Sequence, residues 1–147
     1  MSSGPAKVDV DDLVIALEFA SVGEVYGNQA FVSVKTGKIF FKSEDLGIQE
    51  DAPADLETSE EFLCMPNKKR FGLGRDLVFS FVEEKLPDRW LDVRDFFRRR
   101  GAYARFKHML ESRNMLEAWY RYEETRTREA LRRWCEDNGL ELAETAK

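Results

Sequence analysis

Hydrophobic residues near the start of the chain recur every three or four positions, which is the period of an α-helix. The residues that share this face are Val10, Leu13, Val14 and Leu17. Asp9 stands just before them, where a short acceptor side chain can satisfy free backbone N–H groups of the first helical turn. The sequence therefore predicts a helix that begins at residue 10 and ends before Gly23.

The pattern changes to alternation over residues 29–34, which is typical of a half-buried β-strand. Thr36-Gly37 is a turn signal, and residues 38–42 run back as the second strand of a hairpin. The acidic segment 43–61 is interpreted as a surface loop, and the apolar run 61–65 predicts a third strand. We expect a third strand because a two-stranded hairpin alone is only marginally stable in water.

The chain after Pro66 has helical periodicity almost throughout. The apolar stripes are separated by possible helix ends at Leu86-Pro87, Gly101, Arg113-Asn114, Thr127 and Asn138-Gly139. Gly101 could be tolerated within a helix or could separate two helices, and we favour a break. One helix, three clustered strands and then four or five helices predict an α+β fold, in which the N-terminal helix and small antiparallel sheet pack with a C-terminal helical bundle.

The length of 147 residues favours one domain with a sizeable core. We expect a disordered leader over 1–7, a single domain over 8–140 and a tail over 141–147. Within the domain, 8–66 form the helix and sheet, and 67–140 are helical. No apolar run reaches the ~18–20 residues that a membrane span requires, and the start lacks a secretory signal. The two cysteines are interpreted as reduced, buried thiols of a cytoplasmic protein.

Charge is distributed unevenly along the chain. Residues 1–67 hold four Lys against 13 Asp and Glu, whereas residues 68–134 hold 18 Lys and Arg against 11 acids. The net charge of −5 therefore conceals a basic second half. An anionic partner would be attracted to this helical half of the chain.

The densest basic cluster surrounds Gly101. Its members are Arg94, Arg98, Arg99, Arg100, Tyr103, Arg105 and Lys107. Guanidinium groups bind phosphates through paired hydrogen bonds, and exposed aromatic rings can stack on bases. If the helix continued without a break, Arg94, Arg98 and Arg105 would share one face. Three interpretations stay open: contact with nucleic acid, pairing with the acidic first half of the same chain, and contact with an acidic protein.

A second candidate site precedes the first helix after Pro66. Its members could hold an anion, and they are Lys68, Lys69, Arg70, Gly72, Gly74 and Arg75. Glycines at a helix start let backbone N–H groups approach an anion, and the helix dipole favours negative charge there. The segment lacks the Lys-Ser/Thr pair of a Walker loop and the spacing of the dinucleotide fingerprint. An ordinary loop is the alternative.

Aromatic residues follow helical spacings in the second half, at Trp90, Trp119, Tyr120, Tyr122 and Trp134. Core packing is the first interpretation of this series. Some of these rings could instead line a groove for a partner, because Trp and Tyr are frequent in binding hot spots.

No catalytic or metal-binding pattern stands out in the sequence. His108 is the single histidine, and Cys64 and Cys135 lie 44 and 27 residues from it, far from the short spacings of zinc ligands. We find neither a nucleophile motif nor a recognisable frame of paired carboxylates. We therefore expect no enzyme activity, no cofactor and no metal.

Three segments of the helical half are distinctive: Gly74-Arg-Asp-Leu-Val-Phe-Ser-Phe-Val82, Val93-Arg-Asp-Phe-Phe-Arg-Arg-Arg-Gly-Ala-Tyr-Ala-Arg-Phe-Lys107 and Leu116-Glu-Ala-Trp-Tyr120. They resemble an uncharacterised bacterial protein family, uncharacterised protein family 0158, and the likeness covers most of residues 10–139. The resemblance implies a small, cytoplasmic, single-domain bacterial protein. The family has no assigned activity, so the resemblance carries no catalytic role to any residue.

The function that these patterns favour is that of a small non-enzymatic binding protein. Its basic C-terminal helices would contact a polyanion, with the backbone of DNA or RNA as the first candidate. The alternative is a protein-interaction or regulatory module with an acidic partner. The net negative charge weighs against nucleic acid, because domains dedicated to nucleic-acid binding are usually basic. The sequence carries no signature of an oligomeric state.

Overall fold

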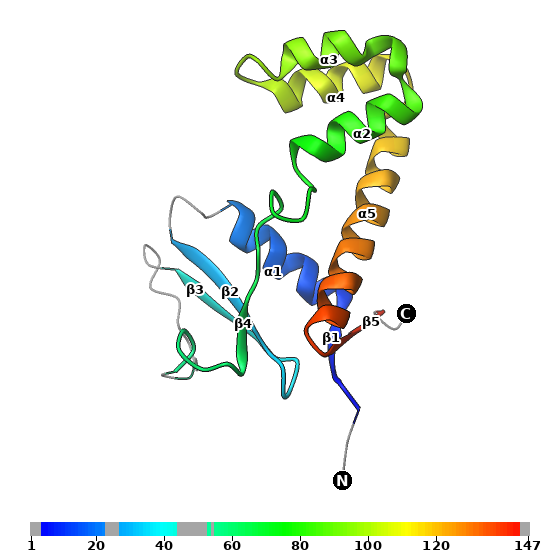
Figure 1. Ribbon diagram of the computed structural model, residues 1–147. Helices are drawn as coiled ribbons and strands as arrows, with labels where there is room; N and C mark the ends of the chain where they lie inside the picture. Colours follow the sequence, from blue (N-terminus) through cyan, green and yellow to red (C-terminus); the bar gives the residue numbers. More distant parts are fainter. Residues whose placement is uncertain (1–3, 23–26, 44–52, 54, 145–147) are drawn as a thin grey trace. The chain divides into compact units, whose positions relative to one another are not determined.

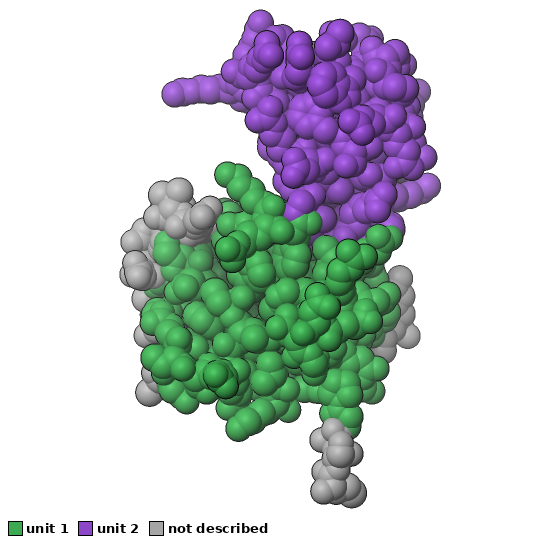
Figure 2. Space-filling view, viewed as in Figure 1, with its two compact units in different colours: residues 1–71, 128–147 green, residues 72–127 purple. Residues whose placement is uncertain are grey.

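The computed structural model describes residues 4–22, 27–43, 53 and 55–144. Its helices and strands confirm the predicted α+β class (Figure 1). The chain falls into two compact units (Figure 2): unit 1 comprises residues 1–71 and 128–147, and unit 2 comprises residues 72–127. In the order of the chain, unit 2 is therefore an insertion within unit 1. A single domain over 8–140 stays a prediction.

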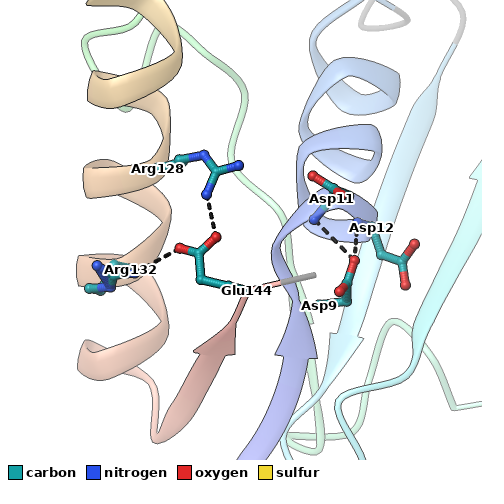
Figure 3. Close-up of polar contacts among 6 residues, drawn as sticks. All are labelled: Asp9, Asp11, Asp12, Arg128, Arg132 and Glu144. Atoms are coloured by element: carbon teal, nitrogen blue, oxygen red, sulfur yellow. Dashed lines mark hydrogen bonds and ion pairs between the residues drawn. The ribbon is translucent and has the colours of Figure 1, made fainter. Parts of the chain in front are cut away.

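Helix α1 (Val10–Val22) begins and ends where the sequence predicts. The carboxylate of Asp9 accepts hydrogen bonds from the backbone N–H groups of Asp11 and Asp12, at 3.1 and 3.2 Å (Figure 3). Asp9 is thus confirmed as the N-cap. The buried face of α1 consists of Val10, Leu13, Ala16, Leu17 and Ala20. Removal of this apolar face from water holds the helix in unit 1.

Three antiparallel strands confirm the predicted sheet: β2 (Asn28–Ser33), β3 (Ile39–Ser43) and β4 (Phe62–Cys64), in the order β3-β2-β4. Gly37 turns the hairpin with a φ of 77°, a conformation that glycine adopts without steric cost. The rings of Phe19 and Phe41 meet edge-to-face with centroids 5.1 Å apart, so α1 packs on one face of the sheet.

The predicted surface loop 43–61 is described only in part, because residues 44–52 and 54 lie outside the described residues. Residues 55–61 form turns. Leu56 within these turns is buried, which anchors this part of the segment to unit 1.

Two short strands that the sequence pattern does not predict pair in parallel, β1 (Ala6–Asp9) with β5 (Leu140–Ala143). Residues 6–7 of the predicted leader and 141–143 of the predicted tail are therefore strand. Four residues show too little alternation to stand out in a sequence, and the pairing partner lies at the other end of the chain. Residues 1–3 of the predicted leader and 145–147 of the predicted tail lie outside the described residues.

A carboxylate that follows β5 links this strand to helix α5 (Leu116–Asp137). Glu144 accepts hydrogen bonds from Arg128 and, at 3.1 Å, from Arg132 (Figure 3). The two arginines are four positions apart, so they share one face of the helix. Because all three side chains are partly exposed, each ion pair stabilises the fold by at most about 1 kcal/mol.

Unit 2 is helical, and it consists of α2 (Arg75–Lys85), the short 3-10 helix η2 (Pro87–Arg89), α3 (Trp90–Phe96), α4 (Ala102–Ser112) and the first half of α5. Its core is aromatic. Trp119 packs edge-to-face against Phe81 and Phe106, with ring centroids 5.3 and 5.1 Å apart. Gly101 has a φ of 74° between α3 and α4, which confirms the predicted break.

The predicted helix boundary near Thr127 is wrong, because α5 runs without interruption from Leu116 to Asp137. Residues 121–129 are mostly polar and contain neither glycine nor proline. Arg and Glu are good helix formers, so the helix continues through this polar segment. It ends near the predicted stop, where Gly139 has a φ of 73°.

Candidate nucleic-acid interface

The basic cluster lies entirely in unit 2, on α3, on the turn 97–101 and on α4. Helices α3 and α4 lie side by side, and the turn joins them (Figure 1). Because α3 ends at Phe96, Arg98, Arg99 and Arg100 lie on the turn. The structure thus presents three consecutive guanidinium groups from one short, exposed connection.

The break at Gly101 corrects one expectation about this cluster. Uninterrupted helix would align Arg94, Arg98 and Arg105 on one face, but only Arg94 lies on α3 and only Arg105 on α4. The left-handed conformation of Gly101 interrupts the helical hydrogen bonding between them. The cluster is therefore spread over α3, the turn and α4, and it does not form a stripe along one helix.

Partners are present for some of these basic side chains. Arg99 pairs with Asp95 at 3.5 Å, and both side chains remain exposed. The guanidinium of Arg94 lies over the ring of Trp90, 5.6 Å from its centroid. Within the part of the chain that the structure describes, no ion pair or side-chain hydrogen bond engages the exposed residues Arg98, Arg100 and Arg105. Of the three arginines on the turn, Arg99 alone forms an ion pair with a described residue of unit 2.

An aromatic group supports the cluster at the start of α4. The ring of Tyr103 meets that of Phe97 edge-to-face at 5.0 Å, and the guanidinium of Arg75 lies 5.8 Å from the Phe97 centroid. Burial raises the pKa of Tyr103, the charge of Glu123 raises it further, and the charge of Arg75 opposes both. The structure thereby brings Arg75, a member of the second candidate site, close to Tyr103.

Lys107 contacts a ring that the sequence pattern assigns to the core. Its ammonium nitrogen lies 5.7 Å from the ring centroid of Tyr120, and Tyr120 is exposed. Trp119, the preceding residue, is buried. Adjacent residues of an α-helix point about 100° apart, so Tyr120 points away from the direction of the buried Trp119.

The second candidate site is divided between the units: Lys68, Lys69 and Arg70 belong to unit 1, and Gly72, Gly74 and Arg75 belong to unit 2. The ammonium of Lys68 already pairs with Glu18, and its backbone N–H donates to Ser21 Oγ at 2.9 Å. Neither unit by itself holds the whole set of residues, so an anion site here stays a prediction.

The remaining candidates for chemistry are scattered. His108 is exposed on α4. Cys135 is buried as expected, but Cys64, on strand β4, is exposed. The described residues hold no group of three or more His, Cys, Asp or Glu side chains that could bind a metal. None of the described helices has the length and apolar character needed to cross a membrane.

The two thiols are expected to differ in reactivity. Burial raises the pKa of Cys135 to about 11, so almost no thiolate forms there near pH 8. Burial also raises the pKa of Cys64, but its side chain is reachable from solvent. An alkylating reagent at about pH 8 should therefore modify Cys64 of the native protein at least ~100-fold faster than Cys135. Mass spectrometry of a time course measures both rates, and Cys64→Ser should abolish the fast reaction. Two equally fast thiols would contradict the burial of Cys135.

Comparison with known proteins gives a family but no activity. The model of an uncharacterised protein family, UPF0158, matches residues 4–146. The UPF0158 protein PA5073 of Pseudomonas aeruginosa is 28% identical over 142 residues, which cover 95% of this chain and 88% of that protein. No solved structure matches the chain.

Proposed function

The chain belongs to the uncharacterised protein family UPF0158, and we propose that it is a non-enzymatic binding protein whose α3–α4 turn contacts the phosphate backbone of DNA or RNA. One observation carries this proposal. Arg98, Arg100 and Arg105 are exposed, and among the described residues no carboxylate neutralises them. Arginine forks without a carboxylate partner would gain most from an external phosphate.

Local charge supports the proposal in spite of the acidic composition. Residues 94–107 contain six Lys and Arg and a single acid, Asp95. At physiological salt the Debye length is about 8 Å. An approaching phosphate therefore responds to the nearest charges, and the net charge of −5 is largely screened. Contacts to the backbone position a protein without reading bases, so binding through this turn should depend little on sequence.

The proposal includes the cytoplasm as the compartment, where nucleic acid is accessible in a bacterium. Both cysteines are free, which suits a reducing compartment. The bacterial relative is in keeping with this placement.

Charge reversal on the turn tests the proposal directly. Arg98→Glu combined with Arg100→Glu should weaken binding to a fluorescein-labelled DNA or RNA on the order of 30-fold, because two charge-assisted phosphate contacts are lost. The slope of log K against log salt should fall by about two between 50 and 200 mM salt. Fluorescence anisotropy titrations at several salt concentrations measure both quantities.

The matched control carries the same charge change on another surface. Lys35 and Arg133 are exposed residues of unit 1, and Lys35→Glu with Arg133→Glu should alter affinity less than about threefold through long-range charge alone. Equal binding by the turn variant and the parent protein would sink the nucleic-acid proposal. Retention of an acidic protein by the parent, and its loss with the turn variant, would then favour the interaction-module alternative.

A further inference from the structure

Two tyrosines on unit 2 expose nearly half of their surface. Tyr103 is 46% exposed and Tyr120 is 45% exposed. They come from different helices, α4 and α5. Large aromatic rings are usually withdrawn from water when a fold can bury them. The exposure of two large rings on one unit therefore points to contact with a partner.

Lys107 relates the positions of the two rings. Tyr103 and Lys107 are four residues apart on α4, so their side chains lie on the same helix face. The ammonium of Lys107 lies 5.7 Å from the centroid of the Tyr120 ring. Both rings therefore lie close to the face of α4 that carries Lys107.

Tyr103 and Lys107 lie about one helical turn, or about 5.4 Å, apart along α4. The side chain of Lys107 lies beside the ring of Tyr120. The ring of Phe97 packs edge-to-face against that of Tyr103, with centroids 5.0 Å apart. The ring of Tyr103 is therefore held in place before any partner arrives. Preorganised rings lose little conformational entropy when a partner binds.

We propose that Tyr103, Lys107 and Tyr120 form a stacking platform for a single-stranded nucleic acid, an inference that rests on the proposed function of the α3–α4 turn. Each tyrosine stacks on one unpaired base, and Lys107 neutralises the phosphate between them. The arginines of the turn hold the strand on the Tyr103 side.

The chemistry selects a single strand over a duplex. Bases within a duplex already stack on their neighbours, and their faces are not available to a protein ring. An unpaired base presents a free face, and stacking on an aromatic side chain contributes to the binding of any sequence. Cationic side chains alone would bind both forms through phosphate. Preference for single strands is therefore the property that the platform adds to the basic turn.

The experiment compares a fluorescein-labelled oligo(dT), an oligo(U) and a duplex DNA with the same number of phosphates. Tyr103→Ala and Tyr120→Ala should each weaken binding of the single strands about 10-fold, while duplex affinity changes less than about twofold. Tyr103→Phe and Tyr120→Phe keep the rings and should restore most of the single-strand affinity. Oligo(dT) and oligo(U) together show whether the 2′-hydroxyl matters.

Leu91→Ala is the matched control, since Leu91 is 64% exposed on α3 and has no role in the platform. It should leave both affinities unchanged. Equal losses on single strands and duplex would overturn the platform, because the rings would then act through the fold or the charge. Unchanged single-strand binding by the alanine variants would also overturn it. In that case a loss caused by Arg98→Glu with Arg100→Glu would still uphold the proposed function, so the two failures are distinguishable.

Discussion

Trp119→Ala is expected to lower the free energy of unfolding of unit 2 by about 3–5 kcal/mol. Trp119 is 2% exposed and contacts the rings of Phe81 and Phe106, and it stacks near Tyr122 with centroids 6.4 Å apart. Alanine would leave a cavity between rings from three helices. A loss of this size is comparable to the entire stability of a small domain. Circular dichroism at increasing urea concentration measures the change.

Trp119→Phe separates the packing effect from the polar group. The indole Nε1 of Trp119 is buried without a hydrogen-bond partner among the described residues, and a buried unsatisfied donor costs about 1–3 kcal/mol. Phenylalanine removes this donor and retains most of the ring. It should therefore destabilise the protein far less than alanine does. If both variants were equally unstable, the stability of unit 2 would not depend on filling this space.

Gly37→Ala is expected to destabilise unit 1 by about 2–4 kcal/mol, for two separate reasons. The φ of +77° is unfavourable for an L-residue. In addition, a Cβ at this position would lie 2.1 Å from the carbonyl oxygen of Lys7 in β1. The hairpin turn and the strand backbone would have to separate. Urea titration followed by circular dichroism measures the loss, and hydrogen exchange should show faster exchange in β1.

Gly139→Ala serves as the control for the conformational term. Gly139 has a similar φ of +73°, but a Cβ at this position would meet no described atom within 4 Å. Its cost should be only about 1 kcal/mol. The difference between the two glycine variants then reports the close approach of the turn to Lys7. Equal costs would show that the turn and β1 move apart easily.

Local patterns predicted most of the fold. The cap at Asp9, the turn at Gly37 and the break at Gly101 depend on neighbouring residues only, and the structure has each of them. The pairing of β1 with β5 escaped prediction because four-residue strands lack a readable period. The uninterrupted α5 was not predicted because the polar segment 121–129 lacks a hydrophobic period, although its Arg and Glu residues favour a helix.

The candidate interface was predictable as a list of residues but not as a surface. Charge counting identifies Arg98–Arg100, since no folding is needed to see consecutive arginines. Their separation from the helical faces depends on one left-handed glycine. The exposure of Tyr120 and its contact with Lys107 depend on tertiary packing, which hydrophobic periodicity alone does not specify.

The interruption of unit 1 by residues 72–127 has a consequence for synthesis on the ribosome. All residues of unit 2 emerge before the C-terminal half of α5 and β5 do. Strand β1 is made first, yet its parallel neighbour, β5, is made near the end. Domains usually fold in the order in which they are translated. Here the later-starting unit can finish folding while the earlier one still waits for its last strand, and the nascent N-terminal segment must stay unaggregated until then.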